Sequence, residues 1–176
     1  MSHDALQFSD LAKVFPTPEG KPKPIPMVSS GGQKPRILIG DGDPVYTLTV
    51  FQHLVEAGYE VVVTEVGTDA IAELRKADHP PVAILDWKLP GMDGTEICER
   101  MRDAGKNVYL ILTSAKPTTQ EIVAGLEMGA DLFLSKSLPP QELVAHVKVG
   151  VRIIHRQRAL AHKLDELAGG RHTLED

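Results

Sequence analysis

The side chain best placed to do chemistry in this chain is that of Asp86. It directly follows the apolar run of residues 82–85, and a Pro-Gly pair and an Asp-Gly pair come shortly after it. A short apolar run bounded by turn residues is typical of a strand buried on both faces of a parallel sheet. Ligands of such sheets bind at the carboxyl ends of the strands. A carboxylate at that point is poorly explained by packing, and it could bind a cation, accept a proton or act as a nucleophile.

Other polar side chains follow further apolar runs in the same way. Because the carboxyl ends of parallel strands lie along one edge of a sheet, we expect these side chains to converge with Asp86. Carboxylates, hydroxyls and one ammonium would then share a single rim, which is a more specific pattern than any one motif. The side chains are Asp41 and Asp43 after residues 37–39, Thr113 and Ser114 after residues 108–112, and Lys136 after residues 132–134.

Strand and helix patterns alternate five times in the middle of the chain. This alternation predicts an α/β fold with a five-stranded parallel sheet, doubly wound as in flavodoxin-like proteins, and right-handed crossovers. Strands are expected at residues 37–39, 60–65, 82–86, 108–112 and 132–134, and helices at 44–57, 68–77, 95–102, 119–128 and 139–168.

The two ends differ in composition from this domain. Residues 16–35 hold six of the thirteen prolines and predict an extended linker. We therefore divide the chain into an N-terminal segment with a Pro-rich linker and one domain, followed by an extension of the last helix and a tail. Their bounds are 1–35, 36–148, 149–168 and 169–176.

Composition narrows the class of protein. Residues 37–147 carry eight Lys and Arg against seventeen Asp and Glu, a net charge of −9, which argues against a nucleic-acid surface. Cys98 is the single cysteine, so no disulfide framework is expected, and we interpret it as an inert core residue. No apolar stretch approaches the ~20 residues of a membrane span. We expect a cytoplasmic protein that binds neither nucleic acid nor membrane.

Residues 36–148 resemble the receiver domain of two-component response regulators. The resemblance implies a signalling protein rather than an enzyme, in which Asp86 accepts a phosphoryl group from a sensor histidine kinase or a phosphotransfer protein. It implies that Thr113 bonds a phosphoryl oxygen, that Lys136 pairs with the phosphoryl group or the aspartate, and that Thr113 and Phe133 form the switch. The motifs that carry it are Ile37-Leu38-Ile39-Gly40-Asp41, Pro90 and Met92-Asp93-Gly94 after Asp86, Leu112-Thr113-Ser114-Ala115, and Gly129-Ala130-Asp131 before Lys136.

The resemblance also implies a Mg²⁺ ion held by Asp41, Asp86 and the backbone carbonyl of Lys88. The family normally has a second acidic residue where this chain has Gly42, so we expect weak Mg²⁺ binding, because ligand charge drives affinity. Asp43 could replace the missing carboxylate, but capping of the following helix is the preferred interpretation.

Ser137 is a second departure, because the family prefers proline after the lysine. A cis peptide bond before a residue other than proline costs about 2.5–4 kcal/mol, so a trans bond is expected here. Together with Gly42, this departure keeps an alternative open: a pseudo-receiver that acts as a protein-interaction module without phosphorylation.

The last helix is expected to extend about four turns beyond the end of the domain. Its apolar residues include Val147, Val151, Ile154, Leu164 and Leu167, with basic residues beside them. This pattern resembles a short coiled coil and predicts a homodimer through the C-terminal helix. One long surface helix without a partner is the alternative.

Overall fold

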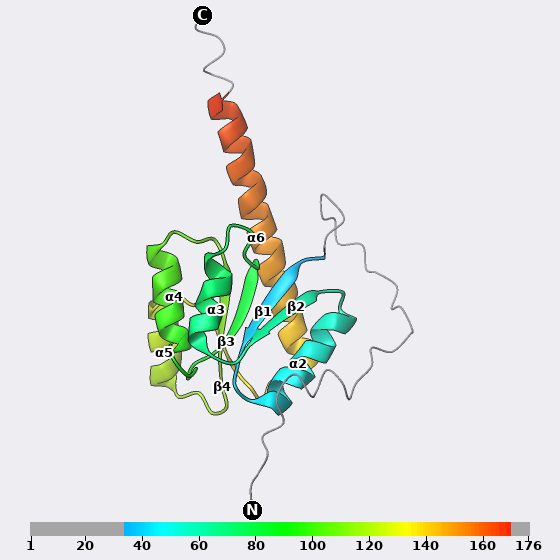
Figure 1. Cartoon of the computed structure of the whole chain (residues 1–176), viewed down its shortest axis with the longest axis vertical. Helices are drawn as coiled ribbons and strands as arrows, with labels where there is room; N and C mark the ends of the chain where they lie inside the picture. The colour runs from blue at the N-terminus through cyan, green and yellow to red at the C-terminus, as the bar shows by residue number, and fades with distance from the viewer. Residues whose placement is uncertain (1–33, 170–176) are drawn as a thin grey trace, which may run out of the picture.

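The computed structural model describes residues 34–169, which form a five-stranded parallel sheet with helices on both faces (Figure 1). The strand order β2-β1-β3-β4-β5 confirms the predicted doubly wound fold. The strands are β1 (Arg36–Gly40), β2 (Glu60–Thr64), β3 (Val82–Asp86), β4 (Tyr109–Ser114) and β5 (Leu132–Ser135). The helices are α2 (Pro44–Glu56), α3 (Gly67–Arg75), α4 (Gly94–Asp103), α5 (Thr119–Glu127) and α6 (Pro140–Gly169).

The strand that carries Asp86 has the bounds expected from the sequence. Its first four residues are buried and pair with β1 on one side and β4 on the other. Strand β4 runs two residues further than expected, because Thr113 and Ser114 continue its pairing with β5. Thr113 is therefore in register with Asp86 instead of following its strand.

The sheet separates two apolar cores. Because side chains alternate along a strand, Leu38 and Leu85 face the core under α3, α4 and α5, while Ile39 and Ile84 face the core under α2 and α6. Cys98 is fully buried in the first core, and burial raises the pKa of its thiol to about 12. The backbone at the ends of the strands is thus held by packing on both sides.

Helix α6 has a packed part and a projecting part. Val147, Val151 and Ile154 are buried against the sheet, whereas every residue from Arg156 to Gly169 is exposed. Figure 1 shows this second part projecting beyond the ends of the strands. The apolar stripe expected from the sequence is therefore divided between an internal core and a free helix face.

The helices were also compared with the requirements of a membrane span. No helix among residues 34–169 has the length and apolar character needed to cross a membrane. The predicted N-terminal segment, up to residue 33, and the predicted tail after Gly169 lie outside the described residues.

Candidate functional site

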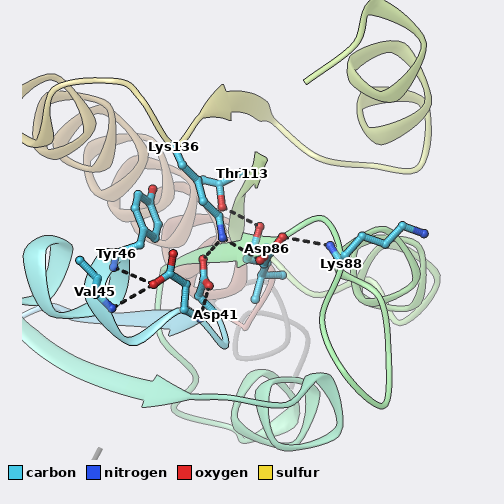
Figure 2. Close-up of polar contacts among 9 residues, drawn as sticks. Asp41, Val45, Tyr46, Asp86, Lys88, Thr113 and Lys136 are labelled. Carbon is cyan, nitrogen blue, oxygen red and sulfur yellow. Dashed lines mark hydrogen bonds and ion pairs between the residues drawn. The ribbon is translucent and has the colours of Figure 1, made fainter. Parts of the chain in front are cut away.

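The predicted rim residues do converge. Asp41 follows β1, Asp86 ends β3, Thr113 lies beside it in β4, and Lys136 follows β5. Figure 2 shows their side chains gathered at the carboxyl ends of the strands, with Lys136 reaching down between the two carboxylates. The parallel sheet thus brings together groups that are up to 95 positions apart in the sequence.

One ammonium serves both carboxylates. The Lys136 Nζ atom lies 2.7 Å from Asp86 Oδ2, to which it donates a hydrogen bond, and 2.7 Å from Asp41 Oδ2. The second contact is also an ion pair. The Asp41 side chain is 1% exposed and that of Asp86 19% exposed, so Asp86 is the more accessible of the two carboxylates.

Burial and charge act against each other in this cluster. Burial raises the pKa of Asp41, although its contacts with Lys136 and the Asp43 backbone oppose the rise. Burial would lower the pKa of Lys136, but the hydrogen bonds and charges of the two carboxylates outweigh it and raise that pKa. Lys136 therefore stays protonated and positively charged in the centre of the site.

The Thr113 hydroxyl is placed to change partners. It is 1% exposed and donates to the backbone oxygen of Leu85 at 3.4 Å, which is long for a hydroxyl hydrogen bond. A weakly held donor beside Asp86 could turn to an oxygen of a group bound there. The predicted role of Thr113 is thus compatible with its position.

Lys88 meets the site through its backbone. Its N–H donates to Asp86 Oδ1 at 3.0 Å, while its ammonium is 3.6 Å from Asp93 and points away from the carboxylates (Figure 2). The exposed ammonium therefore neutralises neither Asp41 nor Asp86 in this arrangement.

Asp43 is engaged in capping. Its Oδ1 accepts from the backbone N–H groups of Val45 at 3.0 Å and Tyr46 at 3.2 Å, at the start of α2. Its own N–H donates to Asp41 Oδ1 at 2.8 Å, which fixes that carboxylate. These contacts favour the capping interpretation over a metal ligand.

Two carboxylates of this cluster could help to hold a magnesium ion. Mg²⁺ prefers carboxylate oxygens and keeps several waters, and Asp41 and Asp86 both contact one ammonium. No group of three His, Cys, Asp or Glu side chains able to hold a metal occurs in residues 34–169. A Cβ atom at Gly42 would meet only the Glu65 carbonyl, at 3.8 Å, so there is room for the missing side chain.

Two aromatic rings lie close to the acceptor. Phe133 is 8% exposed, and its ring centroid is 5.4 Å from that of Trp87, the residue after Asp86. A Cβ atom at Gly125 would come within 2.7 Å of the Phe133 ring, so this ring lies directly on α5. The Phe133 ring therefore contacts both Trp87 and α5, and its switch role stays a prediction.

The loop after Lys136 is held by hydroxyls. The peptide bond before Ser137 is trans, as expected, because the described residues contain no cis bond. The hydroxyls of Ser135 and Ser137 lie 2.7 Å apart, and the Ser137 N–H contacts the Ser135 hydroxyl at 3.2 Å. Two serines thus brace the loop where the family prefers a proline.

Sequence reasoning did not single out Tyr46. Its half-buried ring lies under Lys136, with Nζ 5.0 Å from the ring centroid. Burial raises the pKa of its phenol, and the negative charge of Asp41 adds to the rise. An aromatic residue in the first helical turn after Asp43-Pro44 was the available signal, because the start of this helix faces the rim.

Comparisons with known proteins agree with this plan. A model of the response regulator receiver domain matches residues 37–148. The chain is 36% identical over 117 residues to the DNA-binding response regulator MtrA of Mycolicibacterium smegmatis, which covers 66% of this chain and 50% of that protein. It therefore spans about half the length of the curated relatives it matches.

Solved receiver structures share the fold. A putative response regulator from Chloroflexus aurantiacus is 33% identical with a TM-score of 0.63, covering 68% of this chain and 99% of that one. The receiver domain of the putative regulator NarL from Mycobacterium tuberculosis is 32% identical with a TM-score of 0.60, covering 66% and 94%. Since the family model matches more than half of the chain, this protein belongs to the response regulator receiver family.

Proposed function

We propose that Asp86 is the phosphoryl acceptor of a two-component system. The observation that carries the proposal is the partly exposed Asp86 carboxylate, hydrogen-bonded to Lys136 at 2.7 Å and in register with Thr113. An Asp86 oxygen attacks the phosphorus of a donor phosphohistidine as the nitrogen–phosphorus bond breaks, and the imidazole keeps the electron pair. Lys136 neutralises charge on the transferred group, and Thr113 donates to one of its oxygens.

A Mg²⁺ ion would be held by Asp41, Asp86 and the carbonyl of Lys88. When bound, it supplies positive charge against the phosphoryl oxygens. Because Gly42 provides no carboxylate, this binding is weak, and Lys136 carries a larger share of the neutralisation. The chain's own contribution is to hold Asp86 rigidly at the end of β3.

The partner is a sensor histidine kinase or a phosphotransfer protein, in the cytoplasm.

The switch consists of Thr113, which turns to the phosphoryl group, and Phe133, which moves into the space that Thr113 leaves. MtrA is named a DNA-binding regulator, but this chain spans about half of it. The acidic domain itself remains predicted to bind no nucleic acid.

Intact-mass measurement tests the acceptor. The protein is incubated with a small-molecule phosphodonor and Mg²⁺, and one phosphoryl group is expected on the wild type and none on Asp86→Asn. Asp93→Asn is a matched control, since Asp93 is a 45% exposed carboxylate nearby, and it should be modified like the wild type. No added mass on the wild type with any donor, or equal modification of Asp86→Asn, would contradict the proposal.

The second candidate is a pseudo-receiver that binds partners without phosphorylation. The missing carboxylate at position 42 favours it, because a site with too little metal affinity would not stabilise the transferred group. Trp87 adjoins the acceptor and reports on metal there by fluorescence. A wild type that neither responds to millimolar Mg²⁺ nor gains mass would support this alternative.

We further propose that two copies associate through the projecting part of α6. Leu160, Leu164 and Leu167 are 58–68% exposed and recur every three or four residues, as a coiled-coil seam does. Ile153 and Gln157 continue the same spacing toward the domain. A second copy of this chain would cover these leucines with an identical face.

A further inference from the structure

We infer that Tyr46 is a positioning residue that holds the Lys136 ammonium beside Asp86. Its aromatic face supplies part of the electrostatic attraction that a carboxylate at position 42 would otherwise provide. The inference rests on the proposed acceptor role of Asp86. It concerns a residue outside the acidic positions, the hydroxyl and the lysine that already make up the site.

Three surfaces surround the Lys136 ammonium. Two are carboxylates, each 2.7 Å from Nζ, and the third is the face of the Tyr46 ring, whose centroid is 5.0 Å away. A cation within about 6 Å of a ring centroid is attracted by the negative face of the ring. The Lys136 side chain is only 14% exposed, so water competes little for this contact. Figure 2 shows the ring standing beside the lysine, on the side away from Lys88.

The Tyr46 ring is itself held in place. Tyr46 lies in the first turn of α2, directly after Pro44 and Val45, and its N–H donates to the capping carboxylate of Asp43 at 3.2 Å. The same Asp43 residue donates its N–H to Asp41 at 2.8 Å. One capped turn therefore fixes both the ring and one of the two carboxylates that contact Lys136.

The absence of a carboxylate at Gly42 makes the contact between the Tyr46 ring and Lys136 more important for the position of the ammonium. Lysine is a point charge on a flexible stem, and its direction depends on the groups that surround it. A carboxylate at position 42 would be a further attraction on this rim, but here that position has no side chain, and Asp43 is occupied by the cap. The ring face supplies directional attraction without a third negative charge.

Nuclear magnetic resonance tests the position of the lysine without using phosphorylation. In protein with ¹³C-labelled lysine, a ring below the ammonium shifts the Lys136 ε-methylene signals upfield, and Lys136→Arg identifies these signals by their loss. Tyr46→Phe should keep the upfield shift, whereas Tyr46→Leu and Tyr46→Met should abolish it. Thermal unfolding checks that each variant is folded, and two non-aromatic variants allow for one that is not.

Phosphorylation kinetics test what the contact does. With the small donor and saturating Mg²⁺, Tyr46→Leu and Tyr46→Met should lower the maximal rate by roughly three- to tenfold while the half-saturating donor concentration stays unchanged. Tyr46→Phe should stay within about twofold, since it keeps the ring face. Val45→Ala is the matched control, because Val45 is 74% exposed in the same turn.

A double variant tests the link to Gly42. If the ring replaces a missing carboxylate, Tyr46→Leu should cost less in a Gly42→Asp background than in the wild type. An equal loss in both backgrounds, or an unchanged lysine signal and rate in Tyr46→Leu, would overturn the inference. A wild type that takes no phosphoryl group but shows the upfield lysine signal would instead count against the acceptor role alone.

Discussion

Two carboxylates, Asp41 and Asp86, share one ammonium, and this sharing decides how the site responds to a change of charge. Asp41 is buried and ordered by the Asp43 N–H, so it behaves as a fixed part of the site. Asp86 is the more exposed of the two and is the proposed phosphoryl acceptor. A phosphoryl group on Asp86 would draw Lys136 and Thr113 toward its oxygens, which changes contacts on both sides of β3.

Replacing Gly42 by aspartate should strengthen Mg²⁺ binding by roughly tenfold, because it adds a charged ligand to the site. The substitution is sterically open, since the nearest atom to a new Cβ is the Glu65 carbonyl at 3.8 Å. A Mg²⁺ titration followed by Trp87 fluorescence measures the change. If the affinities of variant and wild type were the same, position 42 would not be the reason for a weak site.

Replacing Asp41 by asparagine should stabilise the protein at neutral pH. The folded pKa of Asp41 is raised by burial, so in the wild type the folded state binds a proton more tightly than the unfolded state does. This costs stability as the pH rises from the unfolded pKa toward and through the raised folded pKa.

Urea unfolding at pH 7 and at about pH 4, near the unfolded pKa of aspartate, measures this effect. The advantage of Asp41→Asn over the wild type should be largest at pH 7 and should shrink at the lower pH. Asp93→Asn, a change at an exposed carboxylate, should show little difference. An Asp41→Asn variant less stable than the wild type at pH 7 would mean that the ion pair with Lys136 outweighs burial.

At the scale of elements, the start of α2 depends on one side chain. Asp43→Ala removes a cap that accepts two backbone hydrogen bonds, and it should cost about 1 kcal/mol of stability in urea unfolding. Asp43→Asn keeps an acceptor oxygen and should cost less. The same asparagine variant should bind Mg²⁺ like the wild type, and a clear loss of affinity would show that Asp43 is a metal ligand after all.

The contact between α6 and the loop before β3, which contains His79, should make the free energy of unfolding depend on pH. His79 lies between α3 and β3, is 9% exposed and receives an Arg158 hydrogen bond on its backbone oxygen at 3.5 Å. Burial lowers its pKa, and the charges of Arg158, Lys106 and Arg36 lower it further. The pKa of His155 on α6 is also lowered by burial and by Arg158.

A lowered folded pKa means that the stability from neutral His79 is complete above the unfolded pKa of about 6.5 and is lost as the pH falls below it. The slope from one histidine reaches about 1.4 kcal/mol per pH unit. Urea unfolding between pH 7.5 and 5 gives the unfolding free energy at each pH. Its slope against pH should be smaller in His79→Gln than in the wild type. Identical slopes would mean that folding does not change the pKa of His79.

The elements could be predicted from the sequence more completely than the site. Strand β3 was expected at its observed bounds, because an apolar run that stops at turn residues is a local signal. The pairing of Thr113 with Asp86 was not expected, because register depends on the neighbouring strand. The Tyr46–Lys136 contact joins residues 90 positions apart and depends on how α2 lies against the β5–α6 loop, which no local pattern contains.

At the scale of the whole molecule, α6 combines two surfaces. Its first turns complete the core, and its last fifteen residues extend roughly 22 Å beyond Ile154 at 1.5 Å per residue. An isolated helix of that length is marginal in water, and three exposed leucines add a cost unless they are covered. A second α6 would stabilise the helix and bury the leucines together.

The charges beside the seam favour a parallel pair. With Leu160 and Leu167 at d positions and Leu164 at a, Arg156 and Lys163 occupy g positions, and Ala161 and Ala168 occupy e positions. In a parallel pair each basic residue faces an alanine of the other copy, whereas in an antiparallel pair Arg156 of one copy would face Lys163 of the other. The repulsion in the second arrangement selects the first, and both domains then lie at the same end.

Substitution of the central leucine tests this arrangement. Leu164→Glu places a charge in the middle of the seam and should convert a dimer to a monomer, as measured by sedimentation equilibrium. Ala159→Glu is the matched control, because it adds the same charge to an exposed position of the same helix, away from the leucine stripe. It should leave the dimer intact, and circular dichroism should show a loss of helix only in Leu164→Glu, whose extension has no partner. A wild type that sediments as a monomer throughout the micromolar range, or two variants with equal effects, would exclude α6 as the dimer interface.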